Sequence, residues 1–277
     1  IGGDMLVGYG SSDFSATTSG QLSDIHEITE RNDIIASWIG QALAFGVSGG
    51  VSILIDNDEI LKTLFSGWRE YRNLLNNTPN VKDKQIETWN GNYLKLKLND
   101  RRRRIGTSDL EIAETQGKLA IQTVDWISII FEMTKKFPNK IFTIHCYILS
   151  QTNNTFGYIS LFLPEIDEMW QLRDKIFINN EDGYLKDKLL DNLQTQYSFK
   201  QACERGTIGL HSLEPRGLRK YMPKGSYNYS QGKELKIKDE NSKIEYYLYK
   251  LWIIAMLKKS ELLELSREIA KFIKESE

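Results

Sequence analysis

The chain has 277 residues, of which 40% are hydrophobic and 26% charged, and its formal net charge is −1. These values are ordinary for a globular protein and exclude wholesale disorder, and the length allows one large domain or two smaller ones. No apolar run reaches the roughly 18 residues that a membrane-spanning helix needs, so no membrane partner is predicted. The two cysteines, Cys146 and Cys203, form no CxxC pair. This argues against a disulfide scaffold or a zinc ribbon and predicts a cytoplasmic location.

Strand and helix patterns alternate in the first eighty residues. A short strand is predicted at residues 5–9, before a loop rich in Ser, Thr and Gly. Apolar residues at helical spacing predict one helix over residues 33–45 and another over residues 58–75, with Asp58 as the N-cap of the second. The β-branched run at residues 51–55 predicts a buried strand between them. This alternation favours a sheet with helices packed on at least one face.

The middle of the chain is predicted to continue in the same way. Residues 93–98 alternate polar and apolar, as in a strand with one solvated face, and a linker is expected near residues 106–117. A helix is predicted over residues 123–137. The runs at residues 142–149 and 156–163 flank a polar segment, which predicts a β-hairpin.

Beyond this hairpin the pattern is mainly helical, with an irregular stretch expected at residues 217–232. A pair of amphipathic helices hinged near residues 258–260 closes the chain. The predicted helices of this part start at Pro164 or cover residues 185–193, 199–203, 244–255 and 262–273. We therefore predict an α+β fold with one domain over residues 1–180 and a mainly helical domain over residues 181–277.

The chain begins with Gly2, Gly3 and Asp4 directly before the first predicted strand. Two glycines permit a tight turn that presents the aspartate at the tip of a hairpin. There a carboxylate can hold Mg²⁺ against a nucleotide phosphate if a second carboxylate lies close by. Asp56 and Asp58, at the end of the predicted second strand, are the nearest candidates for that second ligand. The alternative is an ordinary turn, with Asp58 acting only as a helix cap.

The opening residues 1–7 resemble the GGDD or GGDEF hairpin of the palm domains shared by nucleotidyl cyclases and the large subunits of CRISPR effector complexes. Here Met5 occupies the position at which those families usually carry a second acid. The resemblance implies a palm-like sheet with packed helices, followed by a C-terminal helical bundle that lies along a guide–target duplex or a displaced strand. It also implies other protein subunits as partners.

Positive charge is concentrated in two segments. Residues 95–104 contain six basic residues and one acid, and residues 215–238 contain seven basic residues and one acid. The remaining chain carries a net charge of −12, so a nearly neutral protein can still present a cationic surface. The nucleic-acid contacts predicted from these segments are Lys95, Lys97, Arg101, Arg102, Arg103, Arg104, Arg216, Arg219, Lys220, Tyr221 and Lys224. The alternative is a solvated loop and an exposed strand face with no partner.

Common enzyme signatures are missing from the sequence. It contains no GxSxG, P-loop or GxGxxG motif, and its three histidines match no metal-binding spacing. His145 and Cys146 are adjacent in a predicted strand, so their side chains point to opposite faces and cannot form a catalytic dyad. A PD-ExK-type nuclease site built on Glu87 or Asp100 stays open.

These observations lead to three hypotheses. The first is a nucleic-acid-binding scaffold subunit of a CRISPR-type ribonucleoprotein complex, which holds single-stranded RNA or DNA, or a guide–target duplex, through the basic clusters. The second is a Mg²⁺-dependent nucleotidyl transferase or nuclease that uses Asp4 with Asp56 or Asp58; Mg²⁺ is expected as a cofactor only in this case. The third is a non-catalytic module that docks on another protein through the apolar face of residues 244–273. No catalytic residue is assigned.

Overall fold

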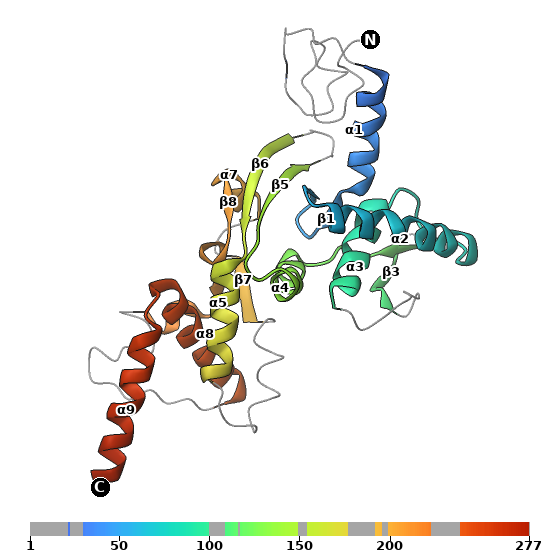
Figure 1. Cartoon of the computed structure of the whole chain (residues 1–277). Helices are drawn as coiled ribbons and strands as arrows, with labels where there is room; N and C mark the ends of the chain where they lie inside the picture. The colour runs from blue at the N-terminus through green and yellow to red at the C-terminus, as the bar shows by residue number, and fades with distance from the viewer. Residues whose placement is uncertain are drawn as a thin grey trace. The chain divides into compact units, whose positions relative to one another are not determined.

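An antiparallel hairpin forms one edge of the central sheet (Figure 1). Its strands are β1 (Phe45–Val47) and β2 (Val51–Ile55), and its turn contains Gly49 and Gly50, both with positive φ, which glycine adopts without a Cβ clash. β2 confirms the predicted strand at this position, whereas β1 was not predicted. The computed structural model describes residues 22, 30–99, 109–115, 117–148, 154–176, 192–195, 199–222 and 239–276.

Three more strands complete the sheet, in the order β1-β2-β5-β6-β8. β5 (Ile141–Ile148) is antiparallel to β2, and Cys146 lies opposite Ile53. β6 (Asn154–Phe162) is the neighbour of β5, and the short strand β8 (Thr207–Ile208) runs parallel to β6. The predicted hairpin of two consecutive strands is therefore confirmed.

Helices accompany this sheet, as the amphipathic patterns predicted. Asn57 caps α2, because its side-chain oxygen accepts hydrogen bonds from the backbone N–H groups of Glu59 and Ile60, both at 3.1 Å. The predicted cap at Asp58 is wrong by one residue, since Asp58 is already the first residue of the helix. The helices of this part are α1 (Arg31–Leu43), α2 (Asp58–Asn77), α3 (Ile86–Leu98), α4 (Trp126–Lys136) and α7 (Phe199–Glu204).

The predicted strand at residues 93–98 is wrong, because these residues form the C-terminal half of α3. The helix crosses β1 so closely that a Cβ on Gly91 would lie 2.8 Å from the carbonyl oxygen of Gly46. In the helical conformation Leu94 and Leu98, one turn apart, are both buried. Burial of Leu94 and Leu98 and the close approach at Gly91 favour the helix more strongly than the alternation of polar and apolar residues favours a strand.

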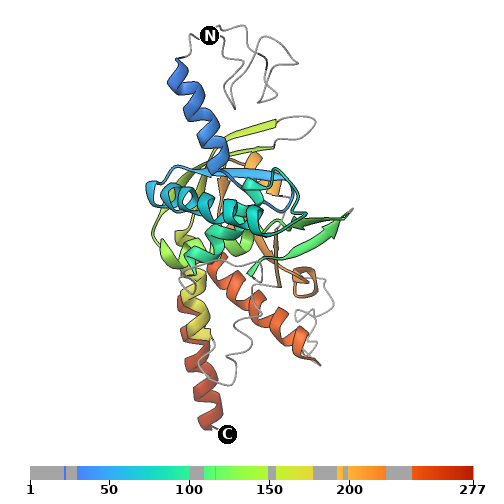
Figure 2. The ribbon, with the colours of Figure 1, turned by 90° about the vertical axis from the view of Figure 1, so that its right-hand side faces the viewer.

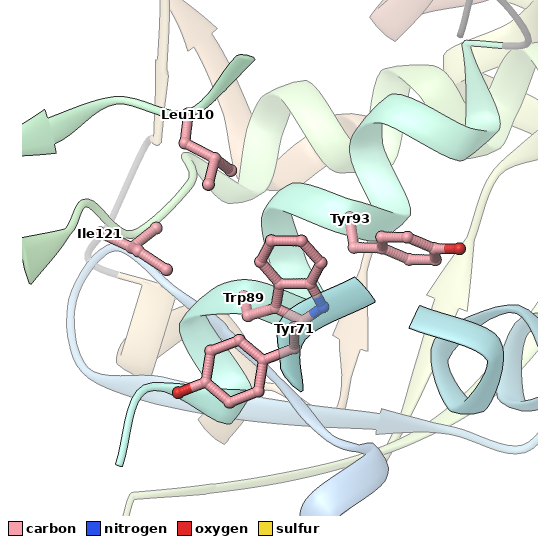
Figure 3. Packing of buried hydrophobic residues seen from close by; sticks show 5 residues of the cluster. All are labelled: Tyr71, Trp89, Tyr93, Leu110 and Ile121. Carbon is pink, nitrogen blue, oxygen red and sulfur yellow. The ribbon is translucent and has the colours of Figure 1, made fainter. Parts of the chain in front are cut away.

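An aromatic cluster anchors α3 (Figure 3). The Trp89 ring lies 5.5 Å from the Tyr71 ring and 5.7 Å from the Tyr93 ring, and its Nε1–H donates to the carbonyl of Gly67 at 3.2 Å. Leu110 and Ile121 close the cluster. These separations are typical of favourable aromatic pairs.

Ile121 belongs to a second, two-stranded sheet, drawn in green at the right of Figure 2. The strands β3 (Ile112–Thr115) and β4 (Lys118–Ile121) are antiparallel, with Ile112 opposite Ile121. The prediction of a linker near residues 106–117 is therefore wrong for residues 112–115, which form β3. Ile112 and Ile121 bring apolar side chains to the Trp89 cluster, which a solvated linker would not do.

The C-terminal part of the chain is mainly helical, as predicted. Pro164 is the first residue of α5, where its missing N–H breaks no hydrogen bond. Trp252 of α8 donates its Nε1–H to the carbonyl of Leu213 at 2.7 Å and so ties that helix to β9. The elements are α5 (Pro164–Ile176), β7 (Leu193–Thr195), η5 (Leu210–Ser212), β9 (Leu213–Pro215), η6 (Leu218–Lys220), α8 (Glu240–Leu257) and α9 (Ser260–Ser276), with β7 and β9 antiparallel.

The fold is thus a mixed α+β fold with C-terminal helices, which confirms the predicted class. The chain divides into two compact units. Unit 1 contains Ile1–Phe137, Ile141–Leu161 and Ser198–Ile208, and unit 2 contains Pro138–Lys140, Phe162–Tyr197 and Gly209–Glu277. The predicted boundary at residue 180 lies outside the described residues and stays a prediction.

Candidate nucleic-acid interface

The first predicted basic cluster begins on α3 of unit 1, where Lys97 already has an acidic partner. Its Nζ lies 3.9 Å from a carboxylate oxygen of Glu70 and 5.0 Å from the centre of the Tyr93 ring. Both side chains of the ion pair are about three-quarters buried. The carboxylate neutralises the lysine, so Lys97 offers little uncompensated charge to a polyanion.

Lys95, on the same helix, lies close to Asp125, the N-cap of α4. Burial raises the pKa of the Asp125 carboxyl, and hydrogen bonds from backbone N–H groups together with the charge of Lys95 limit that rise. Both lysines of this cluster therefore have carboxylate neighbours. The four arginines at residues 101–104 lie outside the described residues, and their contact with nucleic acid stays a prediction.

In unit 2, Lys220 and Tyr221 of the second cluster make structural contacts. Lys220 Nζ forms an ion pair with Glu245 of α8 at 2.7 Å. Tyr221 is buried, and its hydroxyl donates to the carbonyl of Ser242 at 3.2 Å. Its ring stacks on that of Tyr249 at 5.2 Å. Tyr221 was predicted as a nucleic-acid contact, but its ring is buried in the packing between η6 and α8.

The other described members of this cluster are accessible. Arg216 and Arg219 are both exposed on the turn that contains η6. Gly217, between them, has a φ of 75°, and a Cβ there would lie 3.0 Å from a carboxylate oxygen of Glu245. Lys224 lies outside the described residues. Arg216 and Arg219 thus stay candidate phosphate contacts.

A different set of lysines and tyrosines lies on one side of α8 in unit 2. We call Lys243, Tyr246, Tyr247 and Lys250 the Lys–Tyr face. Lys250 Nζ lies 4.8 Å from the centre of the Tyr246 ring and 4.5 Å from that of Tyr247, and Lys243 Nζ lies 5.7 Å from the Tyr247 ring. These distances are within the range of cation–π contacts.

Lys250 is half-buried, and its contacts within the described residues are with rings and not with carboxylates. Burial lowers the pKa of Lys250, and the nearby positive charge of Arg267 on α9 lowers it further. Burying a cation without an anion is costly, and the two tyrosine rings compensate only part of that cost. The site therefore favours the arrival of an anion.

The sequence contained a signal for this face that basic-residue counting did not use. Lys243, Tyr247 and Lys250 are spaced four and then three residues apart, so they lie on one side of a helix. An amphipathic helix was predicted over residues 244–255, but without use of this spacing. Counting charges in windows also missed Lys250, because acidic residues of the same helix reduce the local net charge.

Two of the three predicted metal ligands, Asp56 and Asp58, lie within the described residues. Asp56 is exposed at the end of β2, and Asp58 forms an exposed ion pair with Lys62 at 3.1 Å. Asp4 lies outside the described residues. Within the described part of the chain, no group of three or more His, Cys, Asp or Glu side chains could hold a metal ion. A Mg²⁺ site that includes Asp4 stays a prediction.

The cysteines and His145 of unit 1 also lack the geometry of a nucleophile. Cys146 on β5 and Cys203 on α7 are both buried, and the contact with Cys203, with burial adding to it, raises the pKa of the Cys146 thiol. Burial lowers the pKa of His145, whose ring lies 5.1 Å from that of Tyr158. Both pKa shifts favour the neutral forms of Cys146 and His145.

Glu87 is the remaining polar group with a shifted pKa near the sheet. Burial raises the pKa of its carboxyl, and a 3.0 Å hydrogen bond donated by Ser52 Oγ opposes this rise. Beside it the buried hydroxyl of Tyr147 has no hydrogen-bond partner among the described residues. Within the described residues, only burial and Ser52 shift the pKa of Glu87, and no second carboxylate contributes. Asp100 lies outside the described residues, so the nuclease alternative gains no support.

A small cavity between the central sheet and α4 offers no ligand site for polar molecules. Its wall contains no carboxylate, imidazole or thiol. It is lined by Phe45, Val47, Ile53, Ile55, Trp126, Ile129, Ile130, Met133, Ile144, Leu161 and Ile208.

The fold and the Lys–Tyr face together define an α+β protein with a cationic aromatic site on a C-terminal helix. Comparison of the chain with protein-family models, with curated proteins and with solved structures found no match. None of the described helices is both long and apolar enough to cross a bilayer.

Proposed function

We propose that this chain binds the phosphodiester backbone of nucleic acid through the Lys–Tyr face of α8. The observation that carries this proposal is Lys250, a half-buried cation that contacts two aromatic rings and no carboxylate within the described residues. A phosphate would supply the missing negative charge, and tyrosine hydroxyls are among the donors that proteins use for phosphate oxygens.

The charge distribution around the face supports a phosphate ligand. Lys243 and Arg267 bring two further cations to the same side of unit 2, and the charge of Arg267 reaches Lys250. Arg216 and Arg219 are exposed on the η6 turn of the same unit. Contacts of this kind read no base edges, so we expect binding to depend on salt more than on sequence.

The resemblance of residues 1–7 to palm hairpins narrows this proposal. It adds the role of a non-catalytic subunit of a CRISPR-type ribonucleoprotein complex, which would hold a guide–target duplex or an unpaired strand. Binding of a guide–target duplex, compared with each of its strands alone, tests which of the two is held. Failure to bind either form would contradict both the narrow and the broad proposal.

Replacement of Lys250 tests the proposal directly. Lys250→Met keeps an unbranched side chain of similar length and removes the charge. We expect roughly tenfold weaker binding of a single-stranded oligonucleotide, equivalent to about 1.4 kcal/mol. The slope of log K against log salt should also become shallower by about 0.7 for each lost phosphate contact. Fluorescence anisotropy across a salt series measures both quantities.

Lys82→Met is the matched control, because Lys82 is exposed, lies in unit 1 and loses the same charge. It should leave both the affinity and the salt slope close to the wild-type values. Equal weakening by Lys82→Met and Lys250→Met would show a diffuse charge effect and overturn the assignment to α8. Salt-independent binding, or none at low salt, would overturn the function itself.

A further inference from the structure

The last helix, α9, exposes a continuous apolar stripe. Phe272 is 71% exposed and Leu262 is 54% exposed, values far above those of core residues. No residue of α9 is buried. The exposed apolar residues of the stripe are Leu262, Leu265, Ile269, Phe272 and Ile273.

The side that α9 turns toward its own unit is a different one. Only Leu263 and Arg267 are half-buried on this helix, and they are four residues apart, on the same side. The turn before α9 holds Lys258 with a φ of 52°, and its Nζ pairs with Glu165 of α5 at 3.2 Å. The helix is thus attached through one side, and the apolar stripe faces away from that attachment.

The spacing of the stripe fits a helical partner. Leu262, Leu265, Ile269 and Phe272 are separated by three, four and three residues, which are the a and d positions of a heptad repeat. The 17 residues of α9 give a surface about 25 Å long. An amphipathic helix laid against this stripe would bury it along its full length.

One flank of the stripe is acidic. Glu261, Glu264 and Glu268 lie together beside Leu265 and Phe272, and Glu275 extends this row although it pairs with Lys271 at 3.8 Å. The opposite flank carries the uncharged Ser266 and Ala270. In an antiparallel pair of two α9 helices, the acidic rows would face each other and repel.

We propose that α9 is the docking site for an amphipathic helix of another protein that carries Lys or Arg beside its apolar stripe. Apolar burial supplies the affinity, and the acidic row selects the partner and its register. This inference does not depend on nucleic-acid binding, because the stripe and the Lys–Tyr face are on different helices.

Two synthetic helical peptides with the same leucine stripe test this inference. One carries lysines and the other glutamates on the facing flank, and each is titrated into the full chain. We expect the lysine peptide to bind at least tenfold more tightly, which corresponds to about 1.4 kcal/mol. Replacing Glu261, Glu264 and Glu268 with lysine should reverse this preference. Equal binding of the two peptides, or an unchanged preference in the triple variant, would overturn the proposal.

Ile269→Asp locates the binding on the stripe, and Ala270→Asp is its control, because it adds the same charge next to the stripe. Only Ile269→Asp should abolish peptide binding, and neither exposed substitution should change the melting temperature appreciably. Equal losses in the two variants would contradict docking on the stripe. Dimers in sedimentation, or binding to phosphatidylcholine vesicles, that disappear with Ile269→Asp would assign the stripe to a second copy or to a lipid surface instead.

Discussion

A lysine lies over a tyrosine ring on both α3 and α8, but the surroundings of the two lysines differ. On α3 the Tyr93 hydroxyl donates to Glu70 at 3.3 Å, and the same carboxylate pairs with Lys97. On α8 the described contacts of Lys250 are with rings only. The comparison shows that a lysine–tyrosine pair does not by itself mark a binding site. The presence or absence of a carboxylate decides whether its charge is available.

The largest expected effect tests whether the lysine–tyrosine pair on α3 belongs to a helix that stabilises the fold. Trp89→Ala should lower the free energy of unfolding by about 3–5 kcal/mol, because the indole fills the cluster of Tyr71 and Tyr93 and donates to Gly67. Urea denaturation measures this loss. Trp38→Ala, on the half-exposed Trp38 of α1, should cost much less. Similar losses in the two variants would show that α3 is not anchored by its aromatic residues.

An intermediate effect on stability is expected from Glu87, and it should depend on pH. Burial raises its folded-state pKa above the ordinary value, so the native state binds more protons than the unfolded state. Stability from this group is therefore complete below the ordinary carboxyl pKa and is lost as the pH rises through the folded-state pKa. Glu87→Gln removes this loss and retains an acceptor for Ser52.

The stability of the Gln variant relative to wild type should consequently increase between about pH 4 and about pH 7. Urea denaturation at both pH values checks this increase. A constant difference between the two proteins would mean that Glu87 titrates as an exposed carboxyl does. In that case water would reach the Glu87 carboxyl in the first turn of α3 despite its hydrogen bond from Ser52.

The smallest expected effect is the most direct test of the comparison. Lys97→Met should lower the free energy of unfolding by about 0.5–1 kcal/mol, because it removes a partly buried ion pair and a cation–π contact. Lys250→Met should leave stability unchanged or raise it slightly, since the desolvated charge disappears and the stem contacts persist. Thermal denaturation of both variants shows whether each substitution lowers or raises stability. A larger loss of stability for Lys250→Met than for Lys97→Met would mean that Lys250, and not Lys97, has the structural role.

The parts of the fold that the sequence predicted are those in which local pattern and burial agree. α2, α4, the strands β5 and β6 and the C-terminal helix pair all have apolar residues at the spacing of the element that forms. The second half of α3 was not predicted, because its leucines and lysines alternate as they would in a strand. The close packing of Gly91 on Gly46, 45 residues earlier in the chain, decides the outcome.

The candidate site was predicted less well than the fold. A count of basic residues cannot show that Glu245 reaches Lys220 across 25 residues, or that Tyr221 is buried under α8. It also gives no weight to an isolated lysine such as Lys250. What makes Lys250 distinctive is its burial between two rings, which depends on the tertiary structure and on the approach of Arg267 from α9.

The cysteine pair has a practical consequence. Cys146 and Cys203 are the only two cysteines of the chain, both are buried, and both belong to unit 1. A thiol reagent can therefore modify the chain only when unit 1 opens, whatever happens in unit 2. The rate of labelling therefore measures how often unit 1 opens. Unfolding of unit 1 can thus be followed in the natural chain, with no cysteine introduced.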